Sequence, residues 1–104
     1  MSQDAARAFL AAETLLADRV RLAIVATLAA SALPVDFNTL LDALDLSKGN
    51  LSSHIRKLEE GGLVEVTKSF VDRKPHTTYT CTPRGLRDLE DYLDRLDALL
   101  RGPR

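Results

Sequence analysis

The sequence has 104 residues and a single cysteine, Cys81, which excludes an internal disulfide and any zinc site built from several cysteines. Its two histidines, His54 and His76, lie too far apart for a local metal-binding motif. No pair of carboxylates shows catalytic spacing. Ser52 and Ser53 beside His54 do not indicate a catalytic triad, because neighbouring helix positions point about 100° apart. We therefore expect no metal, no cofactor and no enzymatic activity.

Long apolar segments are missing as well. No run approaches the roughly 20 residues that a membrane-spanning helix needs, and no signal-peptide pattern opens the chain. We therefore expect a cytoplasmic protein that makes no contact with a membrane. The length predicts one domain over residues 1–104, near the size at which a partner subunit often adds stability.

A strong positive charge is the third absence, since the formal net charge is -1. Nucleic-acid-binding proteins are often basic overall, so this value argues against such a function. The charges are unevenly distributed, however. Residues 48–76 carry six basic and four acidic side chains, whereas residues 1–47 carry three basic and six acidic ones. The positive excess in the central segment is small, so one subunit alone is expected to bind DNA weakly and in a salt-dependent way.

Residues 36–60 predict two short helices joined by a tight turn. Asp36 can begin the first helix and Ser47 can cap the second, because both side chains accept hydrogen bonds from the free amides of a helix start. In the second helix, apolar residues recur at i, i+4 and i+7 from Leu51 and predict one buried stripe. The opposite face is small and polar, which suits a major groove. His54 borders the stripe, so we expect it to be partly buried.

Residues 64–82 predict a two-stranded hairpin with a basic tip. Apolar and polar residues alternate over residues 64–67 and 78–82, the pattern of half-buried strands. The segment SFVDRKPH, residues 69–76, is expected to form the tip, where its positive side chains would reach phosphates or a minor groove. Cys81 falls within the alternation, so we expect a packed strand residue and not a reactive thiol.

Two motifs follow one another in this region: L-S-x-x-N-L-S-x-H-I-x-K-L-E-E-x-G-L-V at residues 46–64 and R-K-P-x-T-x-Y-x-x-T-x-x-G at residues 73–85. With them, the chain from about residue 20 to 100 resembles the bacterial winged-helix transcriptional regulators related to the MarR and ArsR groups. The resemblance implies a mainly α winged helix-turn-helix fold with a small β-hairpin wing. It also implies regulation by operator binding as a homodimer. Metal-sensing members of the ArsR group use clustered cysteines or histidines, which are missing here.

The resemblance and the helix pattern together indicate which residues meet double-stranded DNA. Residues 47–57 would face the operator and residues 73–76 would form the wing. Asn50 and Arg56 are candidates for contact with base edges, and Arg73 and Lys74 for contact with phosphates or a minor groove. The full set of predicted DNA-contacting residues is Ser47, Lys48, Gly49, Asn50, Ser52, Ser53, Arg56, Lys57, Lys68, Arg73, Lys74 and His76.

The segments on either side of the winged-helix core, residues 18–82, are predicted to mediate assembly. Leucines spaced 3-4-3-4 give residues 83–101 a heptad seam, and an amphipathic helix is expected within residues 1–17. The seam covers too few heptads to certify a coiled coil, so packing on its own domain stays open. Spare apolar faces at both ends predict a symmetric homodimer. The predicted dimerisation residues are Phe9, Leu15, Leu16, Leu86, Leu89, Leu93, Leu96 and Leu100.

These features predict a sequence-specific transcriptional regulator that binds double-stranded DNA as a homodimer on an inverted-repeat operator, with repression as the expected activity. The alternative is a winged helix that binds another protein and no specific DNA. Basic residues converging on one face, Arg56, Arg73 and Lys74, favour DNA. A small-molecule effector in an apolar crevice between dimer helices stays open, as do the operator sequence and the regulated genes.

Overall fold

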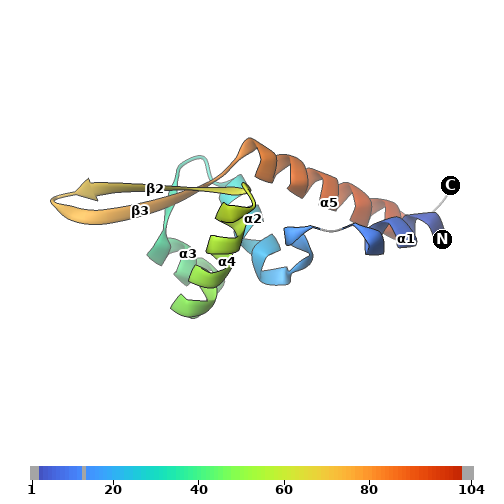
Figure 1. The fold of residues 1–104 in the computed structure, drawn as a ribbon, viewed down its shortest axis with the longest axis horizontal. Helices are drawn as coiled ribbons and strands as arrows, with labels where there is room; N and C mark the ends of the chain where they lie inside the picture. The colour runs from blue at the N-terminus through green and yellow to red at the C-terminus, as the bar shows by residue number, and fades with distance from the viewer. Residues whose placement is uncertain (1–2, 13, 102–104) are drawn as a thin grey trace.

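The helices and strands of the chain are known from a computed structural model, which describes residues 3–12 and 14–101. They follow one another in the order α1 (Gln3–Ala11), η1 (Leu15–Ala17), α2 (Arg19–Ala30), β1 (Val35–Asp36), α3 (Phe37–Leu44), α4 (Lys48–Glu60), β2 (Val64–Val71), β3 (Lys74–Cys81) and α5 (Pro83–Arg101). The fold is mainly α with an antiparallel wing and flanking helices at both ends, as expected (Figure 1). In the described part of the chain, no helix combines the length and the apolar character needed to cross a membrane.

The helix-turn-helix is formed by α3 and α4, and a side chain caps each helix. The Asp36 carboxylate accepts a hydrogen bond of 2.7 Å from the amide of Thr39. The Ser47 hydroxyl accepts one of 3.1 Å from the amide of Asn50. Both predicted helix starts are therefore confirmed. Between the helices, Asp45 has a φ of 51°, which aspartate tolerates because its short side chain can hydrogen bond locally.

α2 lies at the centre of the helical core, as its apolar sequence predicts. Its Ile24, Val25 and Leu28 are buried, and α4 packs against it. The predicted stripe of α4 is buried in the same cluster and consists of Leu51, Ile55 and Leu58. The orientation of α4 is therefore fixed by its apolar residues, which leaves the polar face outward.

The sheet contains a strand that the sequence pattern did not predict. β1 pairs antiparallel with β3, with Val35 opposite Tyr79 and Asp36 opposite Thr78, so that the strand order is β1-β3-β2. A strand of two residues is too short for alternation to reveal. The wing is therefore a three-stranded sheet at its base and a two-stranded hairpin beyond it.

The predicted alternation in the other two strands is confirmed. Val64 lies opposite Cys81 and Val66 lies opposite Tyr79, and all four side chains are buried or half-buried. The ring of Tyr79 contacts that of Phe37 in α3, with centroids 6.4 Å apart. This face of the sheet therefore packs on α3 and α4.

The wing turns more tightly than expected, so the prediction of a tip over residues 69–76 is wrong. β2 and β3 pair as far as Val71 and Lys74, and only Asp72 and Arg73 form the turn. Both have positive φ, 51° and 66°, as a type I′ turn requires. Asp-Arg lacks the glycine that usually marks such turns in a sequence, which explains the miss.

Pro75 is tolerated next to this turn because of its register. In a two-residue hairpin the pair that flanks the turn, here Val71 and Lys74, exchanges the hydrogen bonds. The following pair, Phe70 and Pro75, does not, so the missing amide of Pro75 removes no bond to β2.

Thr82 joins the end of α4 to the start of α5. Its hydroxyl donates a hydrogen bond of 2.6 Å to the carbonyl oxygen of Gly62 and accepts one of 2.9 Å from the amide of Gly85. Its own amide donates to the carbonyl oxygen of Leu63 at 3.0 Å. Any Cβ at Gly85 would collide with that same carbonyl oxygen, so glycine is required for the close approach. The base of α5 is therefore fixed against the end of α4.

The amino-terminal segment differs from the single helix expected over residues 1–17. α1 ends at Ala11 and a separate 3-10 turn, η1, follows at Leu15, while Glu13 between them lies outside the described residues. α1 runs beside α5 (Figure 1), and the rings of Phe9 and Tyr92 lie 5.7 Å apart. The two ends of the chain therefore pack together away from the wing.

Candidate nucleic-acid interface

The polar face of α4 is open along its length. Ser47 at the helix start is exposed as well, although its hydroxyl already accepts the Asn50 amide. A Cβ at Gly49 would meet nothing within 4 Å, so a DNA groove could approach the helix closely there. Every α4 residue predicted to contact DNA is exposed: Lys48, Gly49, Asn50, Ser52, Ser53, Arg56 and Lys57. The structure therefore brings this part of the predicted set together on one surface.

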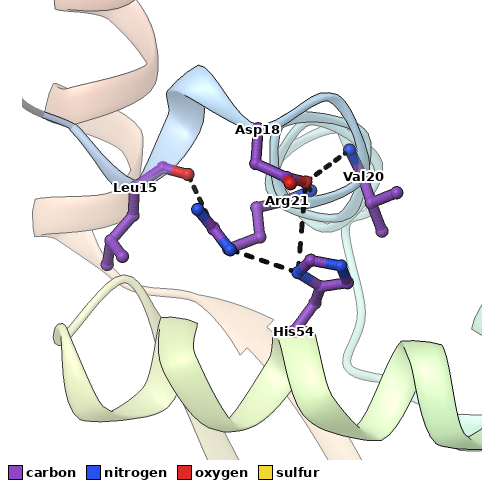
Figure 2. Close-up of polar contacts among 5 residues, drawn as sticks. All are labelled: Leu15, Asp18, Val20, Arg21 and His54. Atoms are coloured by element: carbon purple, nitrogen blue, oxygen red, sulfur yellow. Dashed lines mark hydrogen bonds and ion pairs between the residues drawn. The ribbon is translucent and has the colours of Figure 1, made fainter.

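Behind that face, His54 ties α4 to α2 (Figure 2). Nη1 of Arg21 lies 3.3 Å from Nδ1 of His54, and Nε of Arg21 donates to the carbonyl oxygen of Leu15 at 2.8 Å. A guanidinium can only donate, so Nδ1 accepts here and the ring proton is assigned to Nε2. The His54 side chain is 15% exposed, which confirms the expected partly buried position. His54 therefore helps to position α4 from inside the protein.

Asp18 completes this group of contacts. Its carboxylate caps α2 by accepting hydrogen bonds from the amides of Val20 and Arg21 at 2.9 and 3.0 Å. One carboxylate oxygen also lies 4.0 Å from Nδ1 of His54. The Arg21 amide chiefly holds the pKa of Asp18 below its usual value, against partial burial, with smaller help from the charge of Arg21 and, when its ring is protonated, from that of His54. Sequence reasoning missed Arg21, for which the only signal was a charged residue within an apolar helix.

The basic residues of the wing do not share one face. Since side chains alternate along a strand, Lys68 lies on the same side of the sheet as Val66, the side covered by α3 and α4. Lys74 and His76 lie on the opposite side, and Arg73 lies in the turn. Lys68, Arg73 and Lys74 are exposed. The wing therefore offers positive charge on both sides and at its tip.

His76 lies further back than its predicted role in the tip requires. It pairs with Ser69 in the hairpin and is half-buried. A hydrogen bond from the Thr39 amide chiefly lowers the pKa of Asp36, and the charge of His76 contributes a smaller lowering. His76 thus faces the base of the wing as well as solvent.

The predicted dimerisation residues divide into three groups by exposure. Leu16 and Leu89 are buried in the core of their own chain, so little of either side chain is left for a partner to contact. Phe9, Leu15 and Leu96 are half-buried. The other three, Leu86, Leu93 and Leu100 of α5, are exposed. Leu10 in α1 is exposed as well, although the sequence pattern did not single it out. An apolar surface of α1 and α5 therefore remains open, although it is smaller than expected.

Residues 20–100, most of the chain, match the family model of a winged helix DNA-binding domain. The chain belongs to the winged helix DNA-binding domain family. A transcriptional regulator homologue from Pyrococcus horikoshii superimposes on it with a TM-score of 0.85 and 33% identity. That likeness covers 96% of this chain and 97% of the other, so it extends to the flanking helices.

Other winged helix proteins share the fold at lower identity. MarR has a TM-score of 0.65 and 20% identity over 83% of this chain and 64% of its own. A PadR family transcriptional regulator from Eggerthella lenta has a TM-score of 0.64 and 23% identity over 80% of each chain. These likenesses confirm the expected resemblance to MarR-type regulators at the level of fold.

An uncharacterized protein from Methanocaldococcus jannaschii is 38% identical over 58 residues, which are 56% of this chain. The match spans 63% of that relative, less than two thirds of its length. This relative and the one from Pyrococcus horikoshii are archaeal. The bacterial origin suggested by the resemblance therefore stays a prediction.

This winged helix domain is a homologue of DNA-binding transcriptional regulators, a family of non-enzymatic proteins. Cys81 fits that conclusion. It is half-buried in β3, its Sγ lies 3.5 Å from the carbonyl oxygen of Thr82, and burial raises the pKa of the thiol. A raised thiol pKa leaves little thiolate at neutral pH, so Cys81 is a packed residue and not a nucleophile.

Proposed function

We propose that this chain is a sequence-specific repressor that binds double-stranded DNA as a homodimer, with one α4 helix reading each half of an inverted repeat. The observation that carries the proposal is the open polar face of α4 beside a projecting wing with exposed basic residues. Such a protein would act in the cytoplasm, where the DNA lies.

The chemistry of the α4 face supports direct reading of bases. Gly49, Ser52 and Ser53 are small, so the helix backbone can lie deep in a major groove of about 12 Å width. Asn50 and Arg56 can then make paired hydrogen bonds to adenine and guanine edges, respectively. Both side chains are exposed and need no rearrangement of the core to reach DNA.

The exposed leucines of α5 support the homodimer. Burying a leucine fully contributes about 1.5–3 kcal/mol relative to leaving it in water, so a partner subunit that covers three of them gains several kcal/mol. Two-fold symmetry would then set two α4 helices at a fixed separation, which requires half-sites spaced by about 10 base pairs or a multiple. Binding of one half-site raises the effective concentration of the second reading helix and offsets the weak charge of each subunit.

A selection of bound duplexes from a random pool, followed by fluorescence anisotropy, tests this proposal. The selected site should contain an inverted repeat and bind well above a scrambled duplex at moderate salt. Equal affinity for the two duplexes would refute sequence-specific recognition. Activity as a repressor is tested separately by reporter expression from a promoter that overlaps the selected site, which should fall when the protein is present.

A protein partner is the second candidate function, and the formal net charge of -1 favours it. On this view the same α4 face and wing would contact another protein. The two candidates differ in salt dependence, because DNA binding releases counterions and weakens steeply as salt rises. Absence of any salt-dependent association with duplex DNA would leave the protein partner as the better account.

A small-molecule effector would have room in a cavity of about 380 Å³ between the end of α2 and the start of α5, lined by Leu28, Ala29, Cys81 and Leu86 among others. Ligand sites of this kind are concave and mostly apolar. The cavity also borders Thr82, which joins α4 to α5. Loss of operator binding on adding small apolar ligands, abolished by the cavity-filling change Ala29→Phe, would support this site.

A further inference from the structure

Phe70 is the exception among the aromatic residues of the chain. The other four form two ring pairs, Phe9 with Tyr92 and Phe37 with Tyr79, that join helices to one another or to the sheet. Phe70 belongs to neither pair and is 76% exposed near the end of the wing. Its contribution to folding is therefore small, and most of the surface of its side chain is available to a partner.

The register sets the direction in which Phe70 points. Val64 and Val66 face the helices, so Lys68 and Phe70 continue the same side of β2 beyond the helical core. Pro75 lies directly opposite Phe70 on that side. A rigid proline ring beside an aromatic ring makes an apolar ridge, and this ridge lies on the side of the sheet that carries the recognition helix.

The surroundings of the ridge select DNA as its partner. Lys68 lies two residues away on the same side, and Arg73 follows in the turn. Asp72 is the acidic residue closest to it in the hairpin. An apolar side chain between cations matches the inside of a DNA groove, where base pairs lie between two rows of phosphates.

The length of the hairpin suits a minor groove that neighbours the one occupied by α4. β2 has eight residues, or about 26 Å at roughly 3.3 Å per residue, and the hairpin projects far beyond the helices (Figure 1). From a major groove of about 12 Å width, this reach extends across one row of phosphates into the adjacent minor groove.

We propose that Phe70, supported by Pro75, is an apolar wedge that enters this minor groove and partly unstacks one base step. Apolar side chains inserted in this way kink DNA, and pyrimidine–purine steps yield most easily. Operator choice then depends on a deformable step that α4 does not touch. The inference rests on the proposed DNA binding and adds a second specificity determinant to it.

The test uses the full chain and its selected duplex with 2-aminopurine at each step of the flanking minor groove in turn. Wild-type protein should raise the fluorescence of the probe at one step, because the probe brightens when it loses stacking. Phe70→Ala should abolish that rise and weaken binding about tenfold, within the range for loss of one aromatic contact to a base. Phe70→Leu, which keeps an apolar wedge, should retain part of both effects.

Val71→Ala is the matched control. Val71 neighbours Phe70 in β2 and is 51% exposed, but it points to the other side of the sheet. This variant should behave like wild type in both measurements. Circular dichroism should give all variants the same melting temperature within a few degrees, since the altered side chains are exposed.

Replacing the pyrimidine–purine step by an adenine tract supplies the complementary evidence. Wild-type affinity should fall on the stiff duplex, whereas Phe70→Ala should bind both duplexes equally. The wedge is refuted if wild type binds its selected site specifically but Phe70→Ala shows the same affinity and the same probe signal. No specific binding by wild type would refute the proposed function itself, and the wedge with it.

Discussion

α4 and α5 are both amphipathic helices, yet their apolar residues meet partners in different places. The stripe of α4 is almost completely buried within the chain, with Leu51 and Leu58 at 0% and Ile55 at 5% exposure. In α5 only Leu89 is comparably buried, at 8%, whereas three other leucines remain in contact with solvent. Their exposed fractions are 45% for Leu86, 48% for Leu93 and 76% for Leu100. A similar apolar periodicity therefore builds the core of the chain in α4, whereas in α5 it leaves an apolar surface exposed.

The largest expected effect is loss of stability in Leu51→Ala. Removing a fully buried leucine leaves a cavity and should lower the free energy of unfolding by about 2–5 kcal/mol. Leu93→Ala should cost stability only at protein concentrations where dimers form, because its burial requires a partner. Urea unfolding at two protein concentrations distinguishes these outcomes. Equal losses for both variants at the lowest concentration would remove the distinction between the helices.

The paired change Leu93→Asp with Leu96→Asp should break the proposed dimer. Two carboxylates cannot be buried against a partner without a large desolvation cost. Light scattering should then detect monomers at micromolar concentration, and operator affinity should fall by about a hundredfold as the linked second site is lost. Ala98→Asp, an exposed change on the other side of α5, is the control and should stay dimeric. A monomeric wild type, or a double mutant that stays dimeric and keeps its affinity, would contradict the dimer.

On the polar side of α4, Arg56→Ala should weaken operator binding by about 1–3 kcal/mol and relax the preference at one base pair. The melting temperature should not change, because Arg56 is exposed. Arg73→Ala should instead weaken binding to all duplexes and reduce the salt slope by about one phosphate. Anisotropy titrations at several salt concentrations separate these behaviours. If Arg56→Ala leaves site affinity unchanged, the reading face lies elsewhere.

The smallest effect concerns Asp18, which caps α2 and lies beside His54 of α4. Asp18→Ala removes two hydrogen bonds to backbone amides and should cost about 0.5–2 kcal/mol at neutral pH. The folded pKa of Asp18 lies below its ordinary value of 3.8, so its ionised form adds stability above pH 3.8 that is lost as pH falls through the folded pKa.

A series of urea midpoints below pH 5 measures this dependence. Asp18→Asn is the informative control, since asparagine caps a helix but carries no charge. Wild type should lose more stability than Asp18→Asn as the pH falls below about 4. Parallel curves for the two proteins would show that the charge of Asp18 does not contribute.

Much of the helix-turn-helix could be predicted because its signals are local. Capping by Asp36 and Ser47 depends on residues within the next turn, and the α4 stripe repeats within a single helix. The missed features depend on distant partners. β1 exists only because Val35 meets Tyr79, and Arg21 is explained only by His54, 33 positions later.

The structure places the predicted DNA-contacting residues unevenly, for the same reason. Exposure of the α4 residues follows from the buried stripe, so a helical period was enough to predict that they face solvent. The two faces of the wing depend on strand register, and the register depends on where Asp72 and Arg73 turn. Burial of Leu16 and Leu89 could not be predicted from spacing, because a heptad does not specify whether its partner lies in the same chain.

The hydrogen bonds of Thr82 couple the orientation of α5 to that of α4. They clamp the end of α4 to the base of α5, and α5 extends 19 residues from that clamp, or about 28 Å at 1.5 Å per residue. A rotation of α5 by about 5° displaces one end relative to the other by about 2.5 Å at this length. In the proposed dimer, a small change in how the two α5 helices cross would therefore shift the two α4 helices by ångströms relative to each other. Such a shift is enough to misalign them with the half-sites of an operator.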